Sequence, residues 1–219
     1  MLLGVITSSP EIAEKIKESY TLKFDIHNSE KGIEFFRREN FILLKSSDDK
    51  ILEGLNSLKE NFEPEAYINL DFANSLNNEH LVGDVVLPNT FFEYHNKVDE
   101  IELDKENRDN FIKNPLFLEN YDIQNDYNFE KFGLSIGGIC LSAKNGFKEE
   151  NRKNINMAYE SDIIDEYSYY LIKESLKLDI KNHLYIIKII RALNKEDKKE
   201  ILVENGVNIL NFLINSMIV

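Results

Sequence analysis

The stretch Leu2-Leu3-Gly4-Val5-Ile6-Thr7-Ser8-Ser9-Pro10-Glu11 opens the chain with the unit on which the expected fold rests. Residues 2–6 form an apolar run with the length of a short buried strand. Ser9 is a suitable helix N-cap, Pro10 suits the first helical position, and Glu11 places an acid in the first turn. The stretch therefore predicts a strand, a loop and a helix, in that order.

Strands and helices continue to alternate along the rest of the chain. Apolar runs predict a hairpin at 33–36 and 41–44 and strands at 67–70, 84–87, 132–141 and 184–190. Helical spacing of apolar residues predicts helices over 51–62, 161–178 and 196–218. The polar stretch 97–128 has little periodicity and is interpreted as a surface excursion. This alternation predicts an α/β fold, a three-layer αβα sandwich with a central mixed sheet.

The composition favours one acidic domain that binds neither nucleic acid nor membranes. The chain has 219 residues with no internal repeat or linker, which predicts a single domain over 1–219. Lys and Arg total 26 against 39 Asp and Glu, and the net charge of -13 repels phosphate backbones and anionic lipid headgroups. Because no apolar run approaches the roughly 20 residues of a membrane span and no signal peptide is recognised, a cytoplasmic location is expected.

Residue types that bind metals or form disulfides are sparse. Cys140 is the only cysteine, and it lies in an apolar run where a buried, inert thiol is expected. The four histidines, His27, His80, His95 and His183, are scattered without the spacing of metal ligands. No metal and no cofactor is therefore expected.

Several segments resemble, in order, signatures of the 5'-methylthioadenosine/S-adenosylhomocysteine nucleosidases of the nucleoside phosphorylase superfamily. Residues 67–76 with Gly83-Asp84-Val85-Val86 resemble a strand, a small-residue turn and a second strand of that family. Residues 133–138 resemble a glycine-containing strand, and Asp165-Glu166 falls at a Met-Glu pair. Residues 189–194 resemble the family's Val-Arg-Ala-Ile-Ser-Asp strand and loop. The matches cover most of the chain outside residues 97–128.

This resemblance implies a purine nucleoside as substrate, cleavage of its N-ribosidic bond, and a homodimer. The transition state of that reaction resembles an oxocarbenium ion. An acid assists the leaving base, a carboxylate activates water, and a further carboxylate holds the ribose hydroxyls. Hydrolysis is expected rather than phosphorolysis, because Asp71 would repel a phosphate and the arginines fall in other segments of the chain.

Three residues are the candidates for catalysis that the resemblance implies. Asn194 is the candidate for contact with the leaving base, since Lys195 stands where the family has its acid. Glu11 lies one position before Ile12, which aligns with the family's water-activating glutamate. Asp71, in the turn where the family has glycine, is the third candidate. Asn194 as a loop residue and Glu11 as a partner of the helix dipole are the alternatives.

Four residues are the candidates for binding the substrate. Glu166 would accept hydrogen bonds from the ribose hydroxyls, although a solvated acid on an amphipathic helix is an equal alternative. Ala73 and Gly138 belong to the matched small-residue segments. Leu141 stands where the family has an aromatic residue that stacks on adenine, so weaker binding of the base is expected.

Two functions remain open from the sequence. The first is an enzyme that hydrolyses an adenosine-type nucleoside of the methylthioadenosine or S-adenosylhomocysteine class. The second is a catalytically impaired relative that acts as a nucleoside-binding or interaction protein. The replacements at Ile12 and Lys195 favour the second, and Glu166 favours the first.

Overall fold

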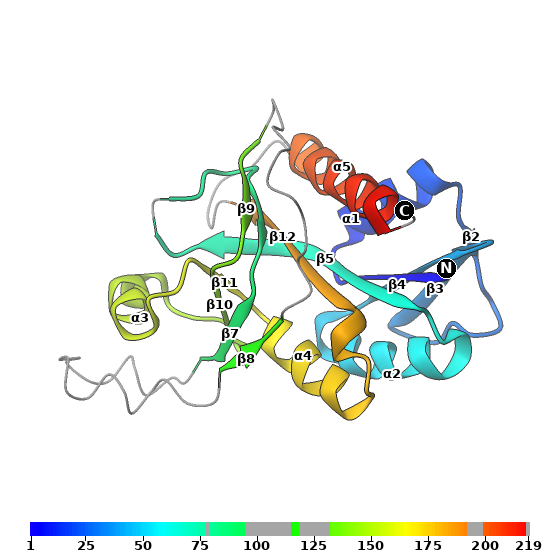
Figure 1. Cartoon of the computed structure of the whole chain (residues 1–219), viewed down its shortest axis with the longest axis horizontal. Helices are drawn as coiled ribbons and strands as arrows, with labels where there is room; N and C mark the ends of the chain where they lie inside the picture. Colours follow the sequence, from blue (N-terminus) through cyan, green and yellow to red (C-terminus); the bar gives the residue numbers. More distant parts are fainter. Residues whose placement is uncertain (78, 95–114, 119–131, 192–198, 218–219) are drawn as a thin grey trace.

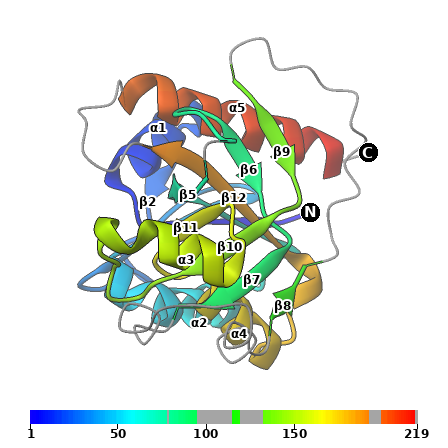
Figure 2. The same ribbon diagram turned by 90° about the vertical axis from the view of Figure 1, so that its left-hand side faces the viewer.

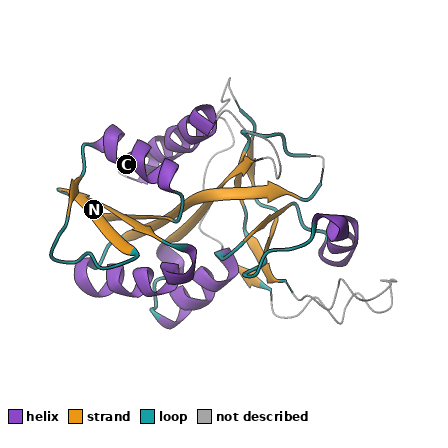
Figure 3. Cartoon of the chain, turned by 180° about the vertical axis from the view of Figure 1, so that it is seen from behind, coloured by secondary structure: helices purple, strands orange, loops and turns teal. Residues whose placement is uncertain are grey.

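The protein is seen in a computed structural model that describes residues 1–77, 79–94, 115–118, 132–191 and 199–217 (Figure 1). A mixed β-sheet lies between two helical layers, as a view turned by 90° also shows (Figure 2). The helices α1 (Pro10–Tyr20) and α5 (Lys199–Met217) cover one face, and α2 (Ile51–Phe62) and α4 (Ser168–Lys177) cover the other (Figure 3). The predicted three-layer αβα sandwich is confirmed.

The sheet combines a parallel half with a second group of strands. Its strands are β1 (Leu3–Thr7), β2 (Lys23–Phe24), β3 (Ile33–Arg38), β4 (Phe41–Ser46), β5 (Ala66–Ser75), β6 (Val85–Leu87), β7 (Thr90–Glu93), β8 (Leu116–Phe117), β9 (Leu134–Ile136), β10 (Ile139–Ser142), β11 (Ile163–Asp165) and β12 (Leu184–Arg191). The main path is β2-β3-β4-β1-β5-β11-β10-β7-β8, and β12 joins β5 to β6, which pairs with β9. The strands β4, β1, β5 and β12 are parallel, whereas β11 is antiparallel to β5.

Strand β5 changes partner part of the way along one edge. Its residues 66–69 pair with β1, and its residues Asn74 and Ser75 pair with β11. Along the opposite edge, β12 pairs with β5 continuously over residues 67–74. Residues 70–73 therefore lie between the part of β5 that pairs with β1 and the part that pairs with β11. A point where neighbouring strands diverge in this way is where a ligand crevice forms in an open α/β sheet.

The helix α1 begins as the opening stretch predicts. The Ser9 hydroxyl accepts a hydrogen bond from the Ile12 amide at 3.2 Å, and Ile12 is fully buried. On the same side of the sheet, α5 buries Ile209, Leu210 and Leu213 in the same apolar cluster. These residues of the last helix therefore pack in the core of the chain.

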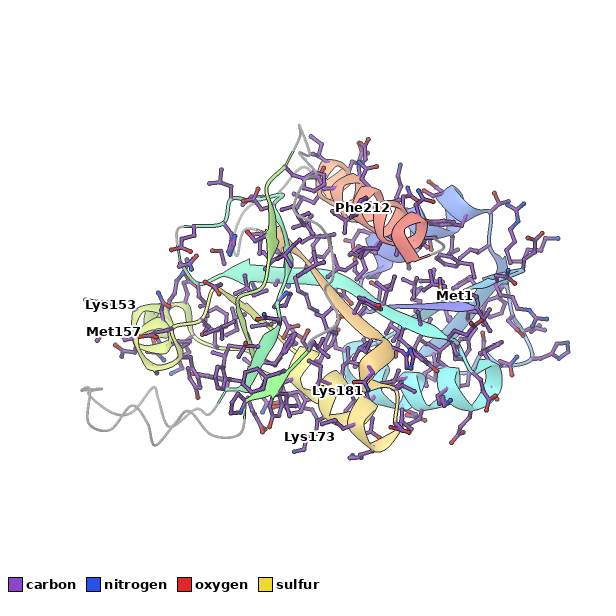
Figure 4. The ribbon with its side chains drawn as sticks, viewed as in Figure 1. Met1, Lys153, Met157, Lys173, Lys181 and Phe212 are labelled. Atoms are coloured by element: carbon purple, nitrogen blue, oxygen red, sulfur yellow. The ribbon has the colours of Figure 1, made fainter. Side chains whose placement is uncertain are left out.

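Two predicted elements are wrong in detail. The strand expected over 132–141 is broken into β9 and β10, because Gly137 and Gly138 adopt φ values of 96° and 100° that favour glycine. The helix expected over 161–178 is the buried strand β11 followed by α4. A short helix, α3 (Arg152–Tyr159), was not predicted and lies at one end of the molecule with Lys153 and Met157 on its outer side (Figure 4).

Most of the stretch 97–128 lies outside the described residues, so its interpretation as a surface excursion stays a prediction. Within it, β8 pairs antiparallel with β7. Three short 3-10 helices complete the described chain: η1 (Asp48–Lys50), η4 (Glu149–Asn151) and η5 (Lys181–His183). None of the helices in the described residues is both long enough and apolar enough to cross a bilayer.

Candidate functional site

A cavity of about 360 Å³ lies at the point where β5 changes partner. Its walls come from the segments that follow β1, β4, β10 and β11, and from β5, β11 and β12 themselves. This volume is within the range of small-molecule sites. The cavity is lined by Ser8, Ser9, Pro10, Glu11, Asp48, Asp71, Phe72, Asn74, Ala143, Gly146, Phe147, Ile164, Asp165, Glu166, Tyr167 and Arg191.

Asp71 lies in the floor of this cavity and is held by donors from two other segments. Its carboxylate accepts hydrogen bonds from the Ser8 amide at 2.7 Å and from the Tyr167 hydroxyl. The Ser8 hydroxyl also lies 2.9 Å from the Tyr167 hydroxyl. Burial raises the pKa of Asp71, and this effect exceeds the opposing attraction of the Lys188 ammonium. Asp71 is therefore a fixed carboxyl group with a raised pKa.

Glu166 lies at the rim of the cavity, between β11 and α4. Its side chain is exposed, which leaves it accessible to a ligand. Partial burial raises the pKa of Glu166, the neighbouring Asp48 carboxylate raises it further, and Arg191 opposes part of this shift. Asp48, in the first turn of η1, also lines the cavity and was not predicted as a site residue.

Glu11 reaches the cavity from the first turn of α1. The helix begins at Pro10, and Ile12 points into the core, so it is Glu11 that faces the cavity. The Ser9 hydroxyl donates a hydrogen bond to Glu11 Oε2 at 3.1 Å. A single position along a helix turns the side chain by about 100°, which here separates a core residue from a cavity residue.

Arg191 corrects the expectation that no arginine lies near Asp71. It ends β12 and lines the same cavity, with its guanidinium 5.7 Å from the centre of the Phe72 ring. The aromatic side chains of Phe72 and Tyr167 also line the cavity without closing it. The arginine was missed because parallel strands bring their ends together from distant parts of the sequence.

Three of the predicted substrate contacts are not among the residues that line the cavity. Ala73 and Leu141 are 1% and 0% exposed and belong to apolar clusters. Gly138 lies in the turn between β9 and β10, beside Asp162. The predicted contacts of Ala73, Gly138 and Leu141 therefore need correction, whereas Asn194 lies outside the described residues.

An aromatic wall was missed by the sequence analysis. Phe147 lines the cavity from the loop after β10, close to Gly146 and Ala143, although Leu141 was expected to leave the base without an aromatic partner. The signal was available in the sequence, since Phe147 follows a strand end at Ser142 by only a few residues.

A buried charged group lies beneath the cavity and was not predicted either. Lys188, in the middle of β12, is fully buried, and its ammonium is 2.8 Å from Asp165 Oδ2. Burial alone would raise the pKa of Asp165, but Lys188 and the hydroxyls of Ser142 and Ser168 hold it below its usual range. Conversely, burial would lower the pKa of Lys188, but Asp165 and Asp71 raise it above its ordinary value. The pair is therefore charged.

The cavity thus brings together carboxyl groups that differ in environment. Glu11, Asp48 and Glu166 surround the opening, and Asp71 lies deeper. Such a set suits a ligand that offers hydroxyl groups or develops positive charge, because both are stabilised by carboxylates. Among the described residues no cluster of three or more His, Cys, Asp or Glu side chains is arranged to hold a metal ion.

No protein-family model and no curated protein matches the sequence of this chain. Solved structures do match its fold. The 5'-methylthioadenosine/S-adenosylhomocysteine nucleosidase of Helicobacter pylori, with butyl-thio-DADMe-Immucillin-A, has a TM-score of 0.73 at 13% identity, covering 99% of this chain and 98% of that one. A futalosine hydrolase mutant of Helicobacter pylori strain 26695 has a TM-score of 0.71 at 14% identity, covering 100% and 98%.

A third structure is that of the same type of nucleosidase from Colwellia psychrerythraea 34H in complex with adenine. Its TM-score is 0.68 at 15% identity, and the match covers 95% of this chain and 90% of that one. At such identities the likeness establishes the fold. The chain therefore has the fold of the nucleoside phosphorylase/nucleosidase superfamily, in the form seen in methylthioadenosine/S-adenosylhomocysteine nucleosidases and futalosine hydrolase.

Proposed function

We propose that the chain hydrolyses the N-ribosidic bond of a purine nucleoside bound in the 360 Å³ cavity. The observation that carries this proposal is the convergence of Glu11, Asp71 and Glu166 on one cavity from three separate segments. These are carboxyl groups that the resemblance had assigned to catalysis and ribose binding. The reaction needs several carboxyl groups in different roles around one sugar.

Glu166 and Phe147 would bind the two halves of the nucleoside. Exposed at the rim, the Glu166 carboxylate is placed to accept hydrogen bonds from vicinal ribose hydroxyls. Phe147 offers the flat apolar surface on which a purine stacks. Asn194 remains a proposed contact to the leaving base.

Glu11 and Asp71 would serve the chemical step. Asp71 already accepts hydrogen bonds from Ser8 and Tyr167, which suits a fixed group that stabilises positive charge on the ribosyl ring. Glu11, in the first turn of α1, is the better base for water because it is partly exposed to the cavity. An oxocarbenium-like transition state would lie between these carboxylates.

Hydrolysis remains favoured over phosphorolysis even with an arginine in the cavity. Arg191 is outnumbered by Glu11, Asp48, Asp71 and Glu166, and Asp165 is neutralised by Lys188. A phosphate would therefore meet a negative surface, whereas water would not be repelled.

The proposed substrate belongs to the methylthioadenosine or S-adenosylhomocysteine class. A neighbouring hollow of about 270 Å³ shares Asp48, Glu166 and Tyr167 with the cavity and adds the apolar residues Ile51 and Leu52. A sugar bound at Glu166 could place an apolar substituent there. The proposal also includes the homodimer and the cytoplasmic location that were expected from the sequence.

The test is release of free base from four nucleosides: methylthioadenosine, S-adenosylhomocysteine, adenosine and inosine. The purified chain is incubated with each, and the base is followed by chromatography. We expect base from at least one nucleoside, and a loss of about 100-fold in kcat/KM with Glu166→Gln, because charged hydrogen bonds to hydroxyls contribute roughly 1.5–3 kcal/mol each. The control Glu18→Gln, an exposed acid on α1, should leave the rate unchanged.

A nucleoside-binding protein without turnover is the second candidate. It is favoured by the bonds that Ser8 and Tyr167 make to Asp71, which occupy lone pairs that a reactive carboxylate would use. A rise in melting temperature with nucleoside, without release of base, would support this candidate. Neither release nor a thermal shift with all four compounds would contradict both.

A further inference from the structure

Lys188 is the most deeply buried charge in the described part of the molecule. Its side chain is 0% exposed, in the middle of β12, where its neighbours on the same face, Ile186 and Ile190, belong to the apolar cluster under α2 and α4. In contrast, Lys173 and Lys181 lie on the outer surface (Figure 4). An ammonium buried in this way is unfavourable without close partners, so its contacts define what it does.

Three groups surround the Lys188 ammonium. Asp165 Oδ2 lies at 2.8 Å and Asn69 Oδ1 at 2.9 Å, and both accept hydrogen bonds from it. The ring of Tyr167 lies with its centre 4.8 Å from the same nitrogen. The cation is therefore bound by a carboxylate, an amide oxygen and an aromatic face, each from a different element of the fold.

Each of these partners either lines the cavity or contacts a residue that lines it. Asp165 and Tyr167 flank Glu166, so the cation holds both neighbours of the rim carboxylate. Tyr167 donates its hydroxyl to Asp71, and the Asn69 amide lies 3.5 Å from Asp71 Oδ2. Lys188 is thus linked to Asp71 through two separate side chains and to Glu166 through the backbone.

Asp165 extends this connection to the helix below the cavity. Its carboxylate accepts hydrogen bonds from the Ser142 hydroxyl at 2.6 Å and from the Ser168 hydroxyl. Ser168 is the first residue of α4, and the Ser142 hydroxyl in turn accepts the Tyr169 amide at 2.9 Å. The cation therefore also fixes the junction of β11 with α4, where Glu166 lies.

Among the described residues, the charged and titratable groups that face Lys188 come from three strands and from the residue before α4. They are Asp165 on β11, Asp71 on β5, Cys140 on β10 and the Tyr167 phenol before α4. Burial holds the pKa values of Cys140 and Tyr167 well above their ordinary ranges, so both are neutral. Asp165 balances the charge of Lys188, and Asp71 is the remaining carboxyl group that its field reaches.

We propose that Lys188 is the positioning residue of the cavity: its ammonium anchors Asp165, Asn69 and Tyr167 and thereby holds Asp71 and Glu166 where they face the ligand. The expected effect of Lys188 on the rate of base release rests on the proposed function. Its geometric content, the control of Asp71 by Lys188, can be tested without any substrate.

A simple alternative is that Lys188 only balances the charge of Asp165. The double variant Lys188→Met/Asp165→Asn separates the two ideas, since a buried ion pair replaced as a whole is often tolerated. Asparagine keeps an acceptor oxygen for the Ser142 hydroxyl, and its amide nitrogen can donate to the oxygen of the Ser168 hydroxyl. If charge balance is all that matters, this neutral pair will behave as the wild type does.

We expect the double variant to fold with a melting temperature close to that of the wild type but to release base about 100-fold more slowly in kcat, because misplaced groups lose this much rate. The carboxyl carbon of Asp71, followed by NMR and assigned with Asp71→Asn, should titrate at higher pH than in the wild type, since the nearby cation is gone. A wild-type kcat in the folded double variant would overturn the proposal, because loss of the cation alone is enough to shift the Asp71 titration.

A second variant covers the case in which the double variant does not fold. Lys188→Arg keeps the charge but cannot place one nitrogen between Asp165 and Asn69 in the same way. A slower kcat with retained fold supports positioning, and wild-type kcat with an unchanged Asp71 titration contradicts it. If the wild type itself releases no base, the proposed function fails, while the Asp71 titration of Lys188→Arg, which keeps the charge, still decides whether Lys188 positions Asp71.

Discussion

The floor and the rim of the cavity are built from similar side chains but differ in how these are held. In the floor, Asp71 and Asp165 are buried and accept hydrogen bonds from several donors each. At the rim, Asp48, Glu166 and Arg191 are exposed. A buried carboxyl group that lost its donors would be left unsatisfied, whereas an exposed one is solvated in any case.

Carboxyl groups therefore have different roles in the floor and at the rim of the cavity. Changes in the floor should alter stability and geometry together. Changes at the rim should alter ligand binding or rate while the fold stays intact. The predictions that follow test this separation.

The largest effect is expected in the floor, with Lys188→Met. It leaves Asp165 buried without its cation, and breaking a buried ion pair from one side costs about 3–5 kcal/mol. The free energy of unfolding, measured by urea denaturation, should fall by this amount. The control Lys15→Met, on the exposed face of α1, should change it by less than about 0.5 kcal/mol. Equal effects of the two variants would remove the distinction between floor and surface.

The second prediction compares the effects on kcat and stability of replacing an acid at the rim and an acid in the floor. Glu11→Gln should lower kcat by about 100-fold, the lower range for a general base, with little change in stability because the side chain is partly exposed. Asp71→Asn should lower both kcat and the melting temperature, since Ser8 and Tyr167 lose a charged acceptor. Rates of base release and thermal melts of both variants are the measurements. A Glu11→Gln variant with full activity would move the role of base to Asp71.

The sequence predicted the layers of this fold, and three of its seven candidate site residues line the cavity. Apolar periodicity located β1, α1, α2 and β12 because each buries a continuous apolar face. It failed over 132–141 and 161–178, where short strands lie directly beside turns or helices and leave too few residues for a period to show.

The candidate site was predicted where it depends on loops after strands and missed where it depends on contacts across the sheet. Glu11 and Glu166 follow β1 and β11 and line the cavity, as the ligand position at strand ends indicates. Asp71 also lines it, but from within β5, which continues to Ser75 where a turn was expected after residue 70. Lys188 lay unnoticed within the apolar strand 184–190, because its partners Asp165 and Asn69 come from distant parts of the chain. A lysine inside an otherwise apolar strand was the available signal, since such a residue needs a buried partner.

The smallest effect is expected within the rim, where Asp48 acts on the pKa of Glu166. Asp48 raises the pKa of Glu166, so Asp48→Asn should lower that pKa and keep Glu166 ionised at more acidic pH. If ionised Glu166 binds the ribose, the acid limb of kcat/KM moves to lower pH, and the rate on that limb rises severalfold while the neutral-pH rate changes little. Glu60→Gln, an exposed acid on α2 that lines neither the cavity nor the neighbouring hollow, is the control. A limb that moves to higher pH, or equally in both variants, would show that Asp48 does not act on Glu166.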